Sequence, residues 1–365
     1  MSQAQDQHRD LEQGAGVGVP GATAHGELIA PSAMSPGRRA FTTVVRSREA
    51  SIALVLVLVV AAATITSPSF LLSSNNWRDL LLTPSILLLL AAGQCVVVIT
   101  RNVDLSVGSV LGLTAYLTGR LFIDTGLPVV AVILAGLVVG GLLGLVNGLL
   151  VGVGRVPALV ITLGTLYVYR GSVLSWAGSN RINASDLPDS FSNLGTQTVL
   201  SIPVLFVLAL VVVVAVGYYL HTTRGGRELY AIGSDPDAAV LYGLDVRRRV
   251  VSAFVLSGAL AGLAGVVYAA RYGTVSSGAG TGIELQAVAA VVIGGVAIFG
   301  GSGTVWGAAI GAVLLVTINR VLPIVGIPDF WQQALVGALI LGAIVLDQVL
   351  SRRRARVLVE ARESS

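Results

Sequence analysis

Long runs of apolar residues alternate with short polar segments along most of the chain. The runs are about 15–26 residues long, and an α-helix needs roughly 20 residues to cross the hydrocarbon core of a bilayer. This pattern predicts an all-α protein, a polytopic membrane bundle of about ten transmembrane helices with short broken helices among them. To within a few residues, the predicted spans are Ser51–Thr66, Leu80–Thr100, Val107–Ile123, Pro128–Val153, Val156–Trp176, Leu200–Leu220, Val250–Ala270, Leu285–Phe299, Val305–Val321 and Phe330–Leu350.

The stretch Arg224–Arg249 interrupts this pattern, because it holds five arginines, four acidic residues and no apolar block. A charge at the centre of a membrane costs roughly 2.5–3.5 kcal/mol, so this stretch is expected to lie in water. A short helix is predicted within it, with Ser234 or Asp235 as its cap, Pro236 in its first turn and Gly243 at its end. Its apolar face needs a surface to pack on, either its own bundle or a soluble partner. That face consists of Ala238, Ala239, Leu241 and Tyr242.

The distribution of arginine predicts on which side of the membrane each segment lies. Arginines are enriched in cytoplasmic loops, and here they concentrate before the first span, in Arg224–Arg249 and after the last span. Both termini and this loop are therefore expected to be cytoplasmic. The predicted order is a disordered cytoplasmic tail over 1–48, a transmembrane domain over 49–350 that contains the loop 224–249, and a cytoplasmic tail over 351–365. A cleaved signal peptide is the alternative at the N-terminus, but a polar region of nearly fifty residues is too long for one.

Composition supports a membrane protein and restricts its chemistry. The chain is 54% hydrophobic and 12% charged, with a mean hydropathy of +0.84, whereas a soluble domain has about 25% charged residues. All 23 basic residues other than histidine are arginines. A Walker-type phosphate loop needs a lysine, so ATP-driven work has to come from another chain. Cys95 is the only cysteine and the three histidines are scattered, so neither a disulfide within the chain nor a metal site is expected.

Polar residues inside or between the apolar runs are the candidates for a solute pathway. Asn102, Asp104 and Ser106 form a polar patch between two spans, and Asn147 and Thr162 lie within otherwise apolar spans. In the functional interpretation they line the pathway, because irregular backbone at membrane depth is tolerated where it lines water. In the structural interpretation Asp104 caps the next helix, Asn147 and Thr162 bond neighbouring helices, and the adjacent Arg101 meets phosphate headgroups.

Two predicted hairpin turns, Ile99–Gly112 and Ile298–Gly307, share a pattern, Gly-Ser/Thr-Val-x-Gly, at Gly108–Gly112 and at Gly303–Gly307. Paired short, glycine-interrupted segments in two halves of a transporter point towards the translocation path, although four matching positions also arise by chance. Another group of small residues predicts a close contact between helices. It consists of Gly136, Gly140, Gly141 and Gly144.

Three stretches together resemble one family: Arg101–Leu117, Asn147–Gly171 and Gly226–Arg271. They are similar to the permease subunit of bacterial ATP-binding-cassette (ABC) importers for monosaccharides, in the ribose/xylose/arabinose branch. The likeness covers the chain from about Arg46 to Arg356. Many ribose-type members have Gly-Gly-Ile-Asp-Leu-Ser where this chain has Arg101–Ser106, and the Arg-Asn form looks more like the rhamnose and autoinducer-2 importers.

This resemblance implies a multi-pass protein of the bacterial inner membrane, surrounded by lipid, with no nucleic acid as a partner. It implies a second permease subunit, either identical or a sister chain, a cytoplasmic ABC ATPase, and an extracytoplasmic sugar-binding protein. No cofactor is expected on this chain, because ATP is bound by the ATPase. The segment matching Glu228–Leu244 is expected to dock that ATPase. The residues expected to couple the two subunits are Arg227, Glu228, Gly233, Asp235, Asp237 and Leu241.

The expected function is that of a passive permease for a monosaccharide or a similar sugar-like solute, driven by a separate ATPase. Gly233→Asp or Asp235→Arg is expected to abolish uptake while leaving the protein in the membrane. The alternative is a stand-alone secondary carrier, which the scarcity of acidic residues in mid-span disfavours. Asp104 is the possible exception, since Glu284 and Asp347 lie at span ends. A membrane-embedded enzyme or a scaffold is a third possibility, but the sequence shows no catalytic arrangement. The sugar and the nature of the second permease remain open at this stage.

Overall fold

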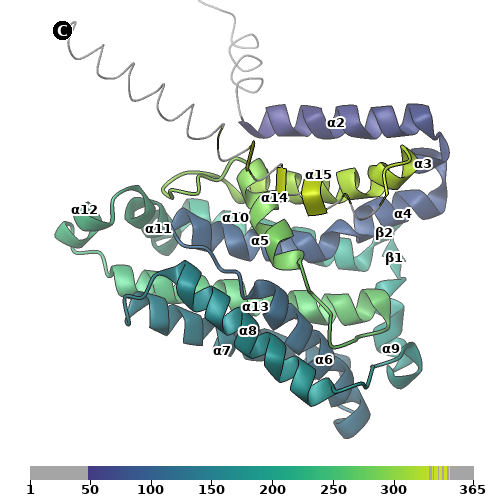
Figure 1. Cartoon of the computed structure of the whole chain (residues 1–365), viewed down its shortest axis with the longest axis horizontal. Helices are drawn as coiled ribbons and strands as arrows, with labels where there is room; N and C mark the ends of the chain where they lie inside the picture. The colour runs from purple at the N-terminus through teal and green to yellow at the C-terminus, as the bar shows by residue number, and fades with distance from the viewer. Residues whose placement is uncertain are drawn as a thin grey trace, which may run out of the picture. The chain divides into compact units, whose positions relative to one another are not determined.

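The computed structural model describes residues 48–328, together with Trp331 and residues 333–335, 337–338, 341–342 and 345. The predicted tail 351–365, the predicted tail 1–48 apart from Arg48, and most of the predicted span Phe330–Leu350 lie outside the described residues. The described part is mainly helical, and its long helices run side by side along one direction (Figure 1).

The elements of the described part follow one another along the chain with short connections. They are α2 (Arg48–Thr66), α3 (Ser69–Leu72), α4 (Ser74–Leu82), α5 (Pro84–Ile99), α6 (Val107–Thr125), α7 (Val129–Gly152), α8 (Ala158–Ala177), η1 (Ala184–Asp186), α9 (Asp189–Ser192), η2 (Asn193–Gly195), β1 (Thr198–Val199), β2 (Ile202–Pro203), α10 (Val204–Thr222), α11 (Arg224–Ser234), α12 (Pro236–Leu241), α13 (Val246–Tyr272), α14 (Ile283–Ile293) and α15 (Val305–Ile324).

Seven helical segments of the described part are long and apolar enough to cross a membrane. They are Glu49–Thr66, Asn76–Ile99, Val129–Gly152, Ala158–Ala177, Val204–Thr222, Val246–Tyr272 and Val305–Ile324. The chain is therefore an all-α membrane bundle, as predicted, but the predicted count of about ten spans is not confirmed.

Two predicted spans, at α6 and α14, coincide with helices that are not among these seven. Helix α6 carries Arg120 and Asp124 in its last turns, where the two side chains form an ion pair at 2.8 Å. Helix α14 has only 11 residues, which gives a length of about 16 Å at 1.5 Å per residue, roughly half of the hydrocarbon thickness. It belongs to the broken helices that the sequence predicted.

Helix α5 lies at the centre of the bundle. Every residue from Pro84 to Ile99 is buried, and the helix packs against α10, α13, α14 and α15. Its sequence has no polar stripe, and a helix that is apolar on all sides is stable when neighbours cover it completely. Helix α2 is mostly exposed instead, because only 6% of its membrane-spanning stretch is buried.

Close backbone packing joins α7 to α13. A Cβ added to Gly136, Gly140 or Gly144 would overlap α13, on the Val266 side chain, the Gly258 carbonyl and the Phe254 carbonyl in turn. Small residues allow two helices to approach at this distance, so three of the four predicted glycines make the expected contact. The fourth, Gly141, is turned aside, and its nearest neighbour is the Cβ of Ala259 at 3.7 Å.

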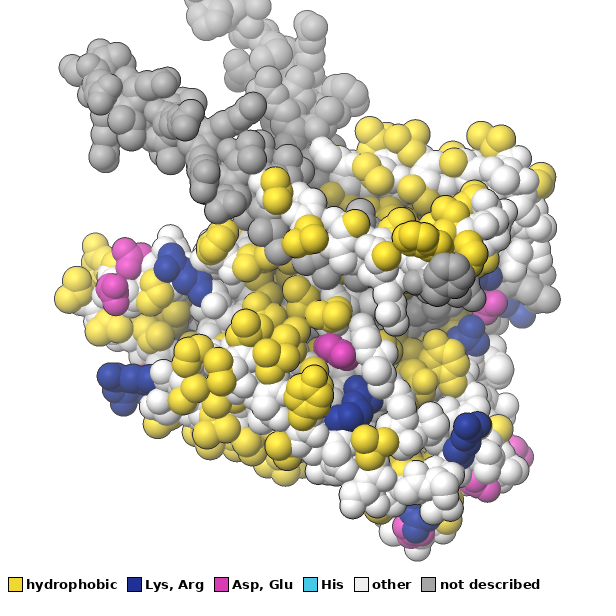
Figure 2. All heavy atoms as spheres, viewed as in Figure 1, with side chains coloured by type: hydrophobic (Ala, Val, Ile, Leu, Met, Phe, Trp, Pro, Cys, Tyr) yellow, Lys and Arg dark blue, Asp and Glu magenta, His cyan; other side chains and the backbone are white. Residues whose placement is uncertain are grey.

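The outward faces of α7 and α8 are apolar. On α7 the exposed residues recur at intervals of four, while the glycine face is buried. Figure 2 shows hydrophobic side chains covering much of the face drawn there, with most charged side chains towards the two ends of the helices. Such a surface is stable in lipid and would be unstable in water. The residues of this series are Val130, Leu134, Val138, Leu142 and Val146, and Leu149 and Leu150 near the end of α7 are exposed as well.

The two ends of the bundle differ in structure. Helices α11 and α12 lie at one end, and α9 with the β1–β2 hairpin lies at the other (Figure 1). The hairpin corrects one predicted boundary, because Leu200 and Ser201 both have positive φ angles, of 51° and 67°, and form its turn. Helix α10 begins only at Val204, after Pro203.

The predicted span Leu285–Phe299 is also wrong at its C-terminal end. Helix α14 stops at Ile293, and Gly295, Gly300 and Gly301 have φ angles between 72° and 82°. Glycine adopts these angles at little cost and other residues do not, so the chain leaves the helix here. The resulting loop extends to Thr304, whose side chain caps α15 by accepting a hydrogen bond from the Gly307 backbone at 3.0 Å.

Candidate functional site

The water-exposed stretch forms two short helices, α11 and α12, joined at Asp235. The Asp235 carboxylate accepts hydrogen bonds from the backbone N–H groups of Asp237 and Ala238, at 3.1 and 3.0 Å. Of the two predicted caps, Asp235 is therefore the N-cap of α12. Gly243 ends α12 with a φ of 77°, and its N–H donates to Val240 while Leu244 donates to Ala239, both at 3.0 Å. These two bonds make a Schellman motif.

Gly233 marks the place where α11 meets the end of α5. It is buried, and a Cβ added there would overlap the carbonyl oxygen of Ile99. The same carbonyl oxygen accepts a hydrogen bond from the Gly301 N–H at 2.9 Å. The backbone of α11, the end of α5 and the loop after α14 therefore meet at one point, with no side chain between them.

Arg101 adds two hydrogen bonds that join α11 to the residues directly after α5. Its Nε donates to the Gly233 carbonyl oxygen at 2.6 Å and its Nη2 donates to the Ser234 carbonyl oxygen at 2.5 Å. Its φ is +65°, a conformation that is uncommon outside glycine and that surrounding contacts must hold in place. Its Nε and Nη2 groups are thus used on α11, and the alternative in which Arg101 meets phosphate headgroups stays a prediction. We call Ile99, Arg101, Gly233, Ser234 and Gly301 the coupling junction.

Both predicted hairpin turns reach the coupling junction. The first contributes Ile99 and Arg101, and the second contributes Gly301 and also Gly303, whose carbonyl oxygen accepts a hydrogen bond from the Tyr230 hydroxyl at 2.9 Å. Burial raises the pKa of the Tyr230 hydroxyl to about 12, so it stays protonated and remains a donor at neutral pH. The shared glycine pattern did not predict that the two hairpin turns contact each other.

Glu228 ties α11 to α13. Its carboxylate pairs with Arg249 at 2.5 Å and with Arg224 at 2.8 Å. The hydrogen bond from Arg249 and then that from Arg224 hold the pKa of Glu228 below its usual range. The carboxylate is thus charged at neutral pH, and only 12% of the side chain is exposed. Glu228 contributes to the attachment of α11 within this chain.

The six predicted coupling residues fall into two groups. Glu228 and Gly233 face the bundle, whereas Arg227, Asp235, Asp237 and Leu241 are exposed. Arg227 also donates to the Thr222 carbonyl oxygen at 2.8 Å. Their role in docking an ATPase stays a prediction.

The predicted apolar face of the short helix is divided in the structure. Ala239 is buried against the protein, while Leu241 and Tyr242 are 88% and 86% exposed. The adjacent Val240, which was not part of the predicted face, is 60% exposed. Three large apolar side chains in a row at this end of the bundle form a surface that a partner can cover. We call Val240, Leu241 and Tyr242 the exposed apolar patch of α12.

Three of the predicted pathway residues lie together in the interior. The Asp104 Oδ1 accepts hydrogen bonds from the Ser106 N–H at 3.0 Å and from the Ser106 hydroxyl at 2.7 Å. Asn147 Nδ2 donates to Ser106 Oγ at 2.8 Å, and Ser257 Oγ donates to Asp104 Oδ2 at 3.3 Å. Burial of this carboxylate is tolerated because three donors surround it. Gln94 adds two bonds to the Asp104 backbone when its amide is oriented to satisfy both groups.

The other two predicted pathway residues are Asn102, which belongs to the irregular segment 100–106 between α5 and α6, and Thr162, which contacts that segment. Thr162 donates to the Val103 carbonyl oxygen at 3.2 Å, and Asn102 donates to the Thr100 carbonyl oxygen at 2.9 Å. Asn102 also lines a pocket of about 460 Å³ at the α11–α12 end, together with Arg101 and Arg155. The structure thus places Asn102 at a cavity and buries Asp104, Ser106, Asn147 and Thr162. Their part in solute passage stays a prediction.

The segment 100–106 connects the buried cluster to the coupling junction. Only two residues separate Arg101, which holds α11, from Asp104 at the centre of the cluster. Helix α11 is therefore hydrogen-bonded to the segment from which α6 begins.

Comparison with known proteins places the chain in a family. Residues 76–344 match the model of a family described as a branched-chain amino acid transport system permease component. The chain belongs to this family. The matched region contains α5, the buried cluster, the coupling junction and the exposed apolar patch of α12.

Individual relatives of this permease cover nearly the same length. It is 37% identical to the autoinducer 2 import system permease protein LsrC of Enterobacter sp. (strain 638) over 86% of this chain and 90% of the relative. It is 34% identical to the D-allose transport system permease protein AlsC of Escherichia coli (strain K12) over 82% of this chain and 91% of the relative. These matches confirm the resemblance seen in the three sequence stretches. No solved structure matches the permease.

Proposed function

We propose that this permease is the membrane subunit of an ABC importer that moves a monosaccharide or a similar sugar-like solute into the cell. The family description names branched-chain amino acids, so membership alone does not select the solute. Relatives that match over more than four-fifths of the chain are named for autoinducer 2 and D-allose. We take these names to favour a sugar-like solute over an amino acid.

The importer would contain a separate cytoplasmic ATPase, a second permease subunit and an extracytoplasmic sugar-binding protein. ATP would be bound by the ATPase, because this chain has no lysine for a Walker-type phosphate loop. Both termini and the α11–α12 end would lie in the cytoplasm of a bacterium whose inner membrane holds the bundle. The concentration of arginines in and around Arg224–Arg249 supports this orientation.

In this mechanism the ATPase covers the exposed apolar patch of α12 and moves α11 with it. The observation that carries the proposal is the coupling junction, where Arg101 and the Ile99–Gly233 backbone contact join α11 to the end of α5. Motion of α11 is passed to the segment 100–106 and to the loop after α14. The buried polar cluster would rearrange as the bundle changes from outward-open to inward-open.

Replacement of Leu241 by Asp tests the docking surface. A charge in the middle of an interface would leave the ATPase bound at least about tenfold more weakly, since apolar anchors at interface centres contribute about 2 kcal/mol or more. The measurement is co-purification of the ATPase with the tagged permease from solubilised membranes. Leu200→Asp is the matched control, because Leu200 is 92% exposed in the β1–β2 turn at the opposite end. Equal recovery of the ATPase with both variants would refute docking at α12.

The alternative function is a stand-alone secondary carrier, which the buried Asp104 favours. Ionisable side chains inside membrane bundles are a feature of proton-coupled carriers, and Asp104 is 1% exposed. Purified permease in liposomes with an imposed proton gradient, and no ATPase, separates the two functions. The importer proposal expects no accumulation of solute; accumulation would establish the carrier instead.

A further inference from the structure

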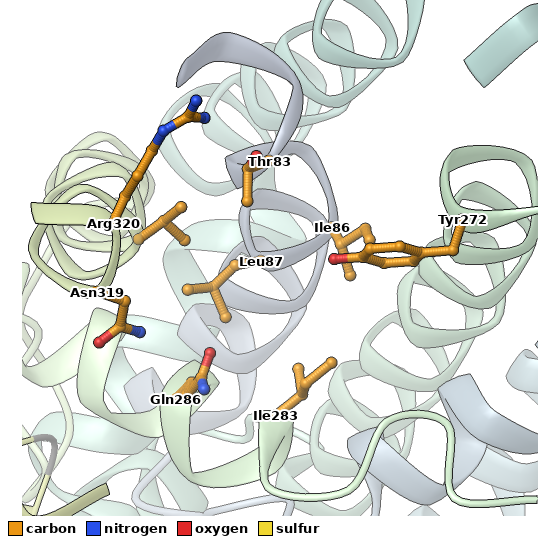
Figure 3. A pocket seen from close by; sticks show the side chains of 9 residues that line it. Thr83, Ile86, Leu87, Tyr272, Ile283, Gln286, Asn319 and Arg320 are labelled. Carbon is orange, nitrogen blue, oxygen red and sulfur yellow. The ribbon is translucent and has the colours of Figure 1, made fainter. Parts of the chain in front are cut away.

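A cavity of about 320 Å³ lies between α5, α13, α14 and α15, towards the end opposite α11 and α12. Its volume falls at the lower end of the range for small-molecule sites, roughly 300–1,000 Å³. Figure 3 shows the side chains of Gln286 and Asn319 near one another on the α14 and α15 side of it, and Tyr272 on the opposite side, on α13. The residues that line it are Thr83, Ile86, Leu87, Tyr272, Ile283, Gln286, Val316, Asn319 and Arg320.

Neutral polar groups at this cavity lack partners within the described part of the chain. The Asn319 Oδ1 is buried without a hydrogen bond. No described residue bonds the Gln286 amide or the Tyr272 hydroxyl either. A buried polar atom without a partner is costly, and rotation of the Asn319 side-chain amide would present its oxygen to a ligand that donates a hydrogen bond. Amides offer both donors and acceptors, which suits hydroxyl groups.

The charge at the mouth of the cavity is already paired. Asp79 accepts from Arg271 at 3.0 Å and lies 3.5 Å from Arg320. Arg320 also donates to the Asn76 side chain at 3.3 Å. Arg320, the one charged residue that lines the cavity, is therefore bonded to neighbours in the protein. The side-chain amides of Gln286 and Asn319 remain available to a solute. This arrangement favours an uncharged ligand over an acid or an amine.

Helix α14 connects the cavity to the coupling junction. Ile283 and Gln286, in its first turn, line the cavity. At its other end Gly294 packs against Gly307 with no room for a Cβ, and the following loop reaches Ile99 through Gly301. The helix has only 11 residues, so the cavity and the junction are about three helical turns apart. A movement of the loop changes the position of Gln286.

We propose that this cavity is the permease's own solute site, which holds one neutral sugar ring by hydrogen bonds to Gln286 and Asn319 and by contact with the Tyr272 ring. The proposal rests on the proposed function and adds the binding groups. Half of the Tyr272 side chain is exposed, and its aromatic ring offers an apolar face beside the two amides. The site releases its solute when the junction moves α14.

The test uses the complete importer, with permease, ATPase and binding protein, in proteoliposomes. Uptake of labelled D-allose and a panel of other neutral monosaccharides first identifies a sugar that the wild type transports with ATP. Gln286→Leu and Asn319→Leu are then expected to lower the maximal rate about fivefold each, which corresponds to loss of a neutral hydrogen bond. Leu285→Met, at the adjacent exposed position of α14, is the control and keeps the wild-type rate.

Deoxy analogues of the same sugar distinguish contact from a structural role. If an amide bonds one hydroxyl, the matching deoxy sugar is slow with the wild type, and the amide variant transports both sugars equally. Wild-type rates in both variants, or an equal loss for every analogue, would overturn the site while leaving the proposed function intact. Failure of the wild type to take up any neutral sugar with ATP would overturn the proposed function and the site together.

Discussion

Gly233 is the position at which the backbone of α11 lies directly against the end of α5. Its Cα faces the Ile99 carbonyl oxygen, and the Gly301 N–H bonds that same oxygen at 2.9 Å. Any side chain at 233 would separate these three backbones. The Gly233→Asp change expected from the sequence to block ATPase docking would therefore also disrupt the junction itself, and Leu241→Asp is the cleaner test of the surface.

Gly233→Ala measures the importance of the contact. The added methyl group has to displace the Ile99 carbonyl, and forced overpacking of this kind costs about 1–3 kcal/mol. We expect ATP-driven uptake to fall about tenfold or more while the amount of permease in the membrane stays within twofold of the wild type.

Gly164→Ala is the matched control for this substitution, because no atom lies within 4 Å of a Cβ added at Gly164 in α8. Uptake by this variant should equal that of the wild type. If Gly233→Ala transports equally well, α11 does not act through its backbone contact with α5.

At the scale of elements, the pairing of α7 with α13 depends on glycines on both helices. A Cβ at Gly140 would overlap the Gly258 carbonyl, and one at Gly258 would overlap the Gly140 carbonyl. The contact is therefore reciprocal and leaves no space that a side chain could occupy. Helix α13 also carries Ser257, which bonds Asp104, so its distance from α7 affects the buried cluster.

Gly140→Val is expected to separate these helices and lower the midpoint of thermal unfolding in detergent, since overpacking costs about 1–3 kcal/mol. Gly141→Ala provides the comparison at the next position. A Cβ there makes only ordinary contacts, with the Ala259 Cβ at 3.7 Å and with Val255 at 3.9–4.0 Å, and alanine favours a helix over glycine, so the midpoint should stay or rise. The same loss in both variants would contradict the close contact.

The sequence predicted most of the helices, because composition and run length decide whether a segment crosses a membrane. It also predicted the short capped helix after Asp235 and the glycine face of α7, because these patterns are local. It did not predict that Arg101 bonds the carbonyls of Gly233 and Ser234, which are more than 130 residues away along the chain. Likewise, the end of α14 at Ile293 depends on glycines with positive φ that an apolar run conceals.

For the whole molecule, the proposed mechanism requires α11 and α12 to face the cytoplasm and the β1–β2 hairpin to face the outside. The lone Cys95 is buried, which makes the chain suitable for labelling at introduced cysteines. Ser185, in η1 near the hairpin end, and Tyr242, after α12, are both exposed and lie at opposite ends of the bundle.

An impermeant maleimide should label Ser185→Cys in intact spheroplasts and Tyr242→Cys only after the membrane is opened. The unmodified chain, with Cys95 alone, should give little signal in either state. Labelling of Tyr242→Cys from outside would reverse the orientation and remove α12 as a contact for a cytoplasmic ATPase.

Arg101 donates its hydrogen bonds to backbone carbonyl oxygens, which every amino acid possesses. The contact therefore does not depend on which side chains α11 carries at these two positions. Substitutions at Ser234 would leave these hydrogen bonds unchanged, since its side chain takes no part in them. In the proposed mechanism, exposed side chains that contact the ATPase can therefore vary while the attachment of α11 to the bundle is kept. Such a permease could pair with a different ATPase through a few substitutions at exposed positions, without changes in the buried residues beneath them.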